Sequence, residues 1–254
     1  MLHKKQQPNY GFPFSSILIR MLTAILMVLF IIALIFFHVP WYFILFISFI
    51  ILPAYVFFGI IMFKKRFYDY RMDIQKKMID ILDIKGNESI LDLGSGAGAL
   101  VISFAKLLQD GKAYGLDKYS LSENKIRTKI IKFVRINYIG NTLKNAKRNA
   151  KIEDVDKKCE FIPGDFTRRL NFQDNCLELI SSFQSLHITS TQKQIRVFQE
   201  IDRVLKKGGR IIFFEPSHFF GWDVNNVKNY FVNSGYTINI TQLKTRVILL
   251  GKKL

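Results

Sequence analysis

Residues 91–100 read Leu-Asp-Leu-Gly-Ser-Gly-Ala-Gly-Ala-Leu, and the rest of the chain is interpreted outward from this stretch. The apolar residues of 89–93 predict a short buried strand. Three glycines follow, namely Gly94, Gly96 and Gly98. They predict a tight turn, because glycine adopts positive φ easily and lets a ligand approach the backbone. The apolar side of 100–108 predicts a helix whose free N–H groups and partial positive charge favour a nucleotide-like ligand at the turn.

Two classes of ligand use such a turn. Gly94-x-Gly96-x-x-Ala99 fits the dinucleotide fingerprint, and Asp117 follows at about the right distance for a ribose contact. Asp92, two residues before the first glycine, favours a different ligand. A carboxylate there suits a cationic amino group and a sulfonium, and it suits a pyrophosphate poorly. A third interpretation is a turn that serves only to pack the strand against the helix.

The motif that begins at Asp92, Asp-x-Gly-x-Gly-x-Gly after a strand, resembles the first motif of class I S-adenosylmethionine-dependent methyltransferases. Later features follow in the family's order: Asp117 ends the second expected strand, Gly164-Asp165-Phe166 closes the third, and Lys206-Lys207-Gly208-Gly209 precedes the fifth. The resemblance covers roughly residues 68–254. It implies an α/β, Rossmann-like fold with a seven-stranded, mostly parallel sheet, helices on both faces and a C-terminal antiparallel hairpin.

The resemblance also implies S-adenosylmethionine as the cofactor. In the family, an acidic residue at the position of Asp117 binds both ribose hydroxyls, and one at the position of Asp165 accepts from the adenine amino group. The neighbour of the latter, here Phe166, packs on the adenine ring. The expected cofactor-binding set is Asp92, Gly94, Ser95, Gly96, Gly98, Asp117, Lys118, Asp165, Phe166 and Phe183. The alternative for Asp117 is the capping of a helix or turn.

Two residues are candidates for catalysis. Methyl transfer from a sulfonium is an in-line displacement, and a general base is needed only when the acceptor loses a proton. His187 follows the expected strand 177–183, and Glu215 ends the strand that begins at 210. A structural role is the alternative for both. The family often has a second histidine after the Leu-His pair, but Ile188 stands there, so a histidine pair is not expected.

The apolar residues are concentrated before residue 64 and predict a membrane anchor. The runs 16–37 and 41–63 are each near the roughly 20 residues that span a bilayer. Lysines and arginines flank the pair of runs but not the link between them, which predicts a cytoplasmic catalytic domain. The expected domains are a cytoplasmic segment 1–15, a transmembrane hairpin 16–66 and a methyltransferase domain 67–254. The alternative is two buried core helices.

The net charge of +17 predicts an anionic partner, either a lipid surface or nucleic acid. Residues 118–139 form a basic segment that is expected either to face a membrane or to cover the active site as a lid. No metal site is expected, because Cys159 and Cys176 belong to no CxxC or Cys/His cluster. The sequence does not indicate the oligomeric state.

The expected function is a membrane-anchored methyltransferase that acts on a small, lipid-like or amphipathic acceptor. The chain looks most like small-molecule and quinone-biosynthesis methyltransferases, in which a strand ending Ser-Phe-x-x-Leu-His is common. A nucleic-acid methyltransferase is the alternative that the charge suggests, although no Asn-Pro-Pro-Tyr-like motif follows 177–183. The sequence is also compatible with a non-catalytic protein that binds S-adenosylmethionine and, more remotely, with a Rossmann oxidoreductase.

Overall fold

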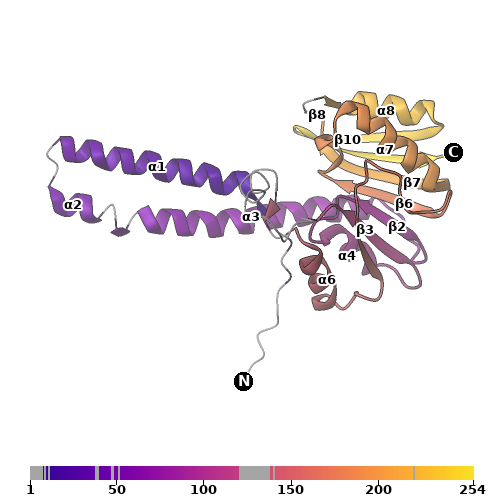
Figure 1. Cartoon of the computed structure of the whole chain (residues 1–254), viewed down its shortest axis with the longest axis horizontal. Helices are drawn as coiled ribbons and strands as arrows, with labels where there is room; N and C mark the ends of the chain where they lie inside the picture. Colours follow the sequence, from indigo (N-terminus) through magenta and orange to yellow (C-terminus); the bar gives the residue numbers. More distant parts are fainter. Residues whose placement is uncertain are drawn as a thin grey trace, which may run out of the picture. The chain divides into compact units, whose positions relative to one another are not determined.

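The structure is a computed structural model. It describes residues 8, 10, 12–37, 40–46, 49–50, 52–119, 138–139, 141–219 and 221–254. The chain forms two compact units, coloured along the sequence in Figure 1. The smaller unit comprises Gly11–Ile74 and Asn124–Ile139, and the larger comprises Met1–Tyr10, Gln75–Glu123 and Gly140–Leu254.

The larger unit is built on a seven-stranded sheet in the order β10-β11-β7-β6-β2-β3-β5 (Figure 1). Its strands are β2 (Ser89–Leu93), β3 (Lys112–Asp117), β5 (Cys159–Pro163), β6 (Leu177–Phe183), β7 (Leu205–Pro216), β10 (Tyr236–Leu243) and β11 (Arg246–Lys253). The first five run parallel, whereas β11 is antiparallel to both β7 and β10. The expected mostly parallel sheet with a terminal antiparallel hairpin is therefore confirmed.

Along the chain, the helices of this unit lie between its strands. They are α4 (Ala99–Ala105), α6 (Leu143–Ile152), the 3-10 helix η2 (Leu186–Ile188), α7 (Thr191–Val204) and α8 (Val224–Asn233). The short strands β8 (His218–Phe219) and β9 (Trp222–Asp223) pair with each other between β7 and α8. β7 is longer than expected, because the Lys-Lys-Gly-Gly stretch is part of the strand.

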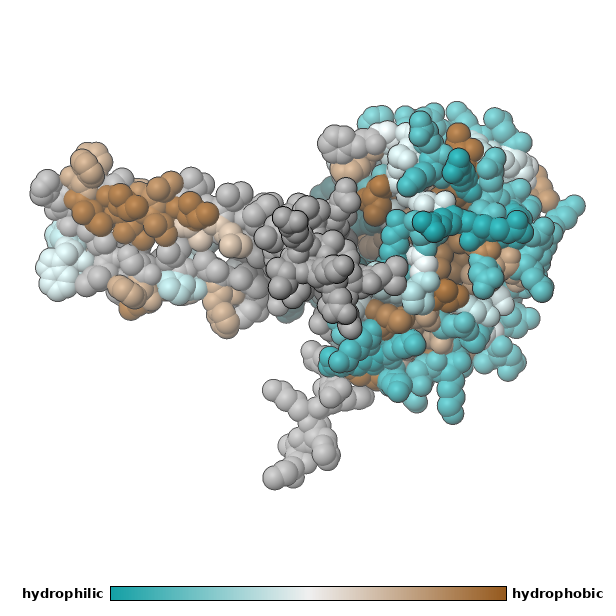
Figure 2. Space-filling view, viewed as in Figure 1, coloured by the Kyte–Doolittle hydropathy of each residue, from teal (hydrophilic) through white to brown (hydrophobic). Residues whose placement is uncertain are grey.

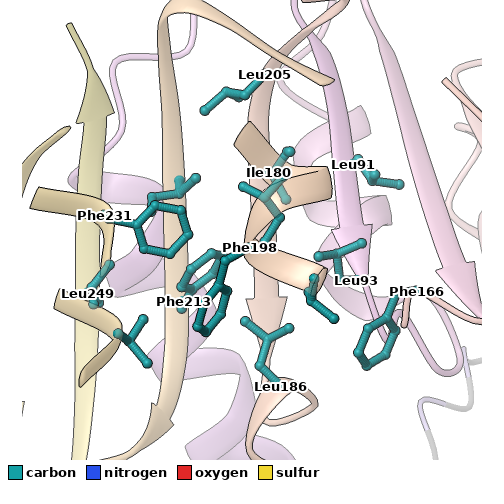
Figure 3. Packing of buried hydrophobic residues seen from close by; sticks show 14 of the residues in the cluster. Leu91, Leu93, Phe166, Ile180, Leu186, Phe198, Leu205, Phe213, Phe231 and Leu249 are labelled. Carbon is teal, nitrogen blue, oxygen red and sulfur yellow. The ribbon is translucent and has the colours of Figure 1, made fainter. Parts of the chain in front are cut away.

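The core packs between the sheet and the apolar sides of α7 and α8, and Figure 3 shows part of it. Leu91 and Leu93 belong to this cluster. Alternate residues of a strand point to opposite faces, so Ile90 and Asp92 face the other side of the sheet. Phe198 and Phe231 lie at the centre with ring centroids 5.2 Å apart. Burying each such ring contributes about 1.5–3 kcal/mol to folding.

The smaller unit contains mainly helices: α1 (Phe14–Phe36), α2 (Trp41–Phe46) and the first part of α3 (Leu52–Asp80). β1 (Phe12–Pro13) pairs with β4 (Tyr138–Ile139). Large side chains of α1 are exposed, among them Leu29, Phe30 and Phe36. Figure 2 shows a brown, apolar surface on this unit and a mainly hydrophilic surface on the larger one.

The predicted transmembrane hairpin is wrong. Within the described ranges, none of the helices combines the length and the apolar character that crossing a membrane requires. Within the second apolar run, the structure gives α2 as far as Phe46 and α3 from Leu52. Pro53 lies in the first turn of α3, where proline is tolerated because the N–H that it lacks would have no partner within the helix. The predicted topology of two spans is therefore wrong, and so is the membrane orientation that was derived from it.

The later part of α3 has a buried side, which includes Ile74 and Met78. The basic segment 118–139 lies largely outside the described residues, since 120–137 are not among them. Its expected role as a membrane-facing surface or a lid therefore stays a prediction.

Two glycines of the larger unit, Gly98 and Gly208, allow a test of how tightly their surroundings are packed. A Cβ on Gly98, whose φ is +83°, would lie 2.7 Å from two ring carbons of Phe161. Gly208 has a φ of +76°, and a Cβ there would meet no described atom within 4 Å. Gly98→Ala should lower the free energy of unfolding by about 2–5 kcal/mol, from left-handed strain and overpacking combined. Gly208→Ala should cost about 1–2 kcal/mol, from strain alone. Urea unfolding followed by circular dichroism measures both, and equal losses would contradict the packing of Gly98 against Phe161.

Candidate active site

The candidate residues gather at one edge of the sheet. β2, β3, β5, β6 and β7 run parallel, so their carboxyl ends meet there. The glycine turn follows β2, Asp117 ends β3, Phe183 ends β6 and Glu215 is near the end of β7. The carboxyl edge of an open α/β sheet is where ligands bind. The structure therefore brings together residues that the sequence analysis took from separate motifs.

The glycine turn is fastened to the neighbouring strand. The backbone N–H groups of Gly94 and Ser95 both donate to the carbonyl oxygen of Leu116, at 2.8 and 3.2 Å. Gly94 has a φ of +78°, and a Cβ there would collide with the side chain of Ser185. The glycine is thus required both for the backbone conformation and for close approach of the loop that follows β6.

Asp117 holds the same turn from the end of β3. Its Oδ2 accepts from the Gly96 N–H and its Oδ1 from the Tyr119 N–H, both at 2.9 Å. Burial raises the pKa of this carboxyl, and the two backbone hydrogen bonds oppose that shift. Asp117 therefore caps the backbone of the turn. Each oxygen has accepted one bond from these two N–H groups, and a carboxylate has about four acceptor positions, so further hydroxyl donors fit.

Asp165 and Phe166 lie just beyond β5. The Asp165 carboxylate accepts from the N–H and the hydroxyl of Thr167, at 2.9 and 2.7 Å, and pairs with the Lys118 ammonium at 3.0 Å. Burial alone would raise its pKa, but these hydrogen bonds and the lysine outweigh burial and lower it. Phe166 is buried and appears in Figure 3 beside Leu93. Carboxylate acceptors at two strand ends and an aromatic ring form a set that fits an adenosyl group.

Three other expected residues have clear structural contacts. Asp92 is almost fully buried and accepts from the Ser181 hydroxyl at 2.8 Å, which joins β2 to β6. The Ser95 hydroxyl lies 3.2 Å from the Tyr119 hydroxyl. The Phe183 ring packs against Phe214 with centroids 4.9 Å apart. None of these contacts tests a cofactor-binding role.

His187 and Glu215, considered separately in the sequence, are in contact. The His187 Nδ1 lies 2.6 Å from Oε2 of Glu215. The other carboxylate oxygen accepts from the Ser182 hydroxyl at 2.8 Å and from the N–H groups of Ser185 and Leu186 at 3.0 Å. Glu215 is only 1% exposed. A carboxylate is an acceptor, so Nδ1 donates to it and the lone pair stays on Nε2, where it can take a proton.

Sequence reasoning missed the serines that connect this pair to the glycine turn. The Ser185 hydroxyl donates to the carbonyl of Leu93 at 2.5 Å, directly before the turn. Its N–H donates to Glu215, so one residue contacts both parts of the site. The signal in the sequence was the pair of small polar residues in an apolar context, Ser182 at the end of the expected strand and Ser185 just after it.

The charge of Asp165 yields a test by titration. Thr167→Val removes a hydroxyl donor and Lys118→Met removes the ammonium, so each variant should raise the pKa of Asp165. Because folding lowers this pKa, the ionised carboxylate stabilises the folded protein at pH values above the usual pKa of 3.8. This stabilisation is lost as the pH falls below 3.8 toward the lowered pKa. Carbon NMR of the carboxyl resonance measures the shift. An unchanged pKa in both variants would contradict the contacts.

Comparison with known proteins gives the family. A family model described as a methyltransferase domain matches residues 84–234. A demethylmenaquinone methyltransferase from Bacillus mycoides is 27% identical over 145 residues, which are 56% of this chain and 51% of the relative. The ubiquinone/menaquinone biosynthesis C-methyltransferase UbiE of Escherichia coli is 29% identical over 141 residues, covering 55% of this chain and 47% of the relative. The chain thus spans about half the length of these curated relatives.

Solved structures agree on the fold. The crystal structure of a SAM-dependent methyltransferase from Aquifex aeolicus superposes with a TM-score of 0.53 and 14% identity, over 70% of this chain and 88% of that one. At this identity the likeness concerns the fold alone. The match to the family model covers more than half of the chain, which therefore belongs to the class I S-adenosylmethionine-dependent methyltransferases, with S-adenosylmethionine as its cofactor.

Proposed function

We propose that this protein methylates a small, apolar, quinone-type acceptor and that His187 removes the proton which the acceptor loses. The observation that carries the proposal is the contact between His187 and the buried Glu215 at the carboxyl edge of the sheet. When bound, S-adenosylmethionine supplies an electrophilic methyl carbon and leaves as S-adenosylhomocysteine. As the acceptor's electron pair forms the bond to that carbon, Nε2 of His187 takes the proton and Glu215 stabilises the resulting imidazolium.

The proposed cofactor contacts use the hydrogen-bond acceptors and the aromatic ring at the carboxyl edge of the sheet. Asp117 accepts from the ribose hydroxyls through its remaining lone pairs, Asp165 accepts from the adenine amino group, and Phe166 packs on the ring. The glycine turn lets the backbone approach the ligand. Ser185 holds this turn and the histidine-bearing loop in one arrangement, because it bonds to both Leu93 and Glu215. Positioning of this kind is the protein's main contribution to an in-line displacement.

An apolar acceptor is supported by the surroundings of His187. The Phe219 ring meets the imidazole edge-on, with centroids 5.1 Å apart. Phe219 is 42% exposed and Ile188 is 56% exposed, so both offer apolar surface next to the base. An aromatic acceptor packs favourably on such side chains. The two curated relatives described above are named for methylation in quinone biosynthesis, which agrees with this chemistry.

The proposed function is tested with the purified protein of residues 1–254 and S-adenosylmethionine labelled in the methyl group. Incorporation is measured into short-tailed demethylmenaquinol, and in parallel into transfer RNA and duplex DNA. We expect label in the quinol product. Label in nucleic acid alone would make the protein a nucleic-acid methyltransferase instead, and a lack of incorporation into the quinol would overturn the proposed acceptor.

Replacement of Asp117 tests the ribose contact. Asp117→Ala should weaken binding of S-adenosylhomocysteine at least tenfold, because a hydrogen bond to a charged group contributes about 1.5–3 kcal/mol. Isothermal calorimetry measures the affinity. Asp110→Ala, at an exposed acidic residue after α4, is the matched control and should bind normally. Equal affinity in the Asp117 variant would leave that residue as a cap of the turn only.

Replacement of His187 tests the base. His187→Ala should lower kcat for the quinol by about 10²–10⁴-fold, the usual contribution of a general base. Binding of S-adenosylhomocysteine should be retained, since the histidine is not among the proposed cofactor contacts. The control is His218→Ala, because His218 is largely exposed and lies on β8. A normal rate in the His187 variant would assign the histidine a packing role.

A further inference from the structure

Asn141 lies against the glycine turn although it belongs to no recognised motif. It comes directly before Thr142, the residue that caps α6. A Cβ placed on Gly96 would lie 2.8 Å from its Nδ2 and 3.1 Å from its Oδ1. Any side chain at position 96 would therefore displace the amide. The close approach of Asn141 is a second reason, besides the positive φ of 53°, for glycine at this position.

The side-chain oxygen of Asn141 is buried and has no hydrogen-bond partner among the residues that the structure describes. Burying an acceptor without a donor is unfavourable, and native proteins keep few such groups. Asn149, on α6 itself, shows the ordinary arrangement: it is fully buried and its Nδ2 donates to the carbonyl of Ala97 at 3.0 Å. Asn141 thus differs from its neighbour in offering an unused acceptor next to the cofactor turn.

Gly96 stands between two acceptors. Its N–H donates to Oδ2 of Asp117. The direction in which a Cβ would project from its Cα faces the amide of Asn141. An S-adenosyl ligand has hydroxyl donors on the ribose and an amino donor on the methionine portion. We propose that Asn141 is a cofactor ligand, whose Oδ1 accepts a hydrogen bond from one of these donors. This inference rests on the proposed cofactor site and adds to it a residue from the segment that precedes α6.

The test separates a ligand from a structural residue by measuring the free and the bound protein. Asn141→Ala should weaken binding of S-adenosylhomocysteine by about three- to tenfold, the effect of one hydrogen bond. The melting temperature of the unliganded variant should be unchanged or higher, because no described residue loses a bond to Oδ1. Asn149→Ala is the matched control and should lower the melting temperature of the unliganded protein, since it leaves Ala97 without its donor.

A conservative variant and a second ligand complete the experiment. Asn141→Asp keeps an acceptor oxygen and should bind more tightly than Asn141→Ala. Methylthioadenosine has the ribose but lacks the amino acid. Weaker binding of both ligands to the alanine variant supports a ribose donor, and weaker binding of S-adenosylhomocysteine alone supports the amino donor.

Two results would overturn the inference. Equal affinity of wild type and Asn141→Ala for both ligands would make Asn141 a structural residue, and the proposed function would stand. Failure of the wild-type chain to bind S-adenosylhomocysteine at all would remove the cofactor site, and the proposed function with it.

Discussion

The buried carboxylate of Glu215 fixes the conformation of the active-site edge. Burying a charge is costly unless donors surround it, and here four groups supply them: a serine hydroxyl, two backbone N–H groups and an imidazole. Three of the four donors come from residues 185–187, in the loop between β6 and α7. That loop therefore adopts the shape that the end of β7 dictates. Because Ser185 also holds Leu93, the constraint extends to the glycine turn.

Asp117 plays the corresponding part on the other side of β2. It accepts from Gly96 and from Tyr119, so the turn and the start of the following segment are fixed by one carboxylate. Asp92, from within β2, ties that strand to β6 through Ser181. Three acidic residues on three strands thus organise the edge through contacts within the protein. Preorganisation of this kind lowers the entropy that binding must overcome.

The sequence predicted secondary structure correctly where a local hydrophobic pattern coincides with a motif. The Asp92-to-Gly98 motif and the apolar residues of 89–93 predicted β2 and its turn, and the apolar side of 100–108 predicted α4. Apolar composition misled in the N-terminal half, because two runs near the length of a membrane span predicted a hairpin, whereas none of the described helices could cross a membrane. The contact of His187 with Glu215 depends on the pairing of β6 with β7, which aligns Phe183 with Phe214. The unpartnered oxygen of Asn141 is a property of packing, which no motif records.

The position of β11 has a consequence for biosynthesis. This strand is made after the other six strands of the sheet, yet it lies between β7 and β10. Among the described strands β10 pairs only with β11, so a nascent chain that ends before Arg246 has no partner strand for it. During that interval the long β7 has an open edge, and open edges pair readily with other chains. The sheet therefore closes only once β11 has been synthesised, and until then the open edge of β7 exposes the nascent chain to association with other chains.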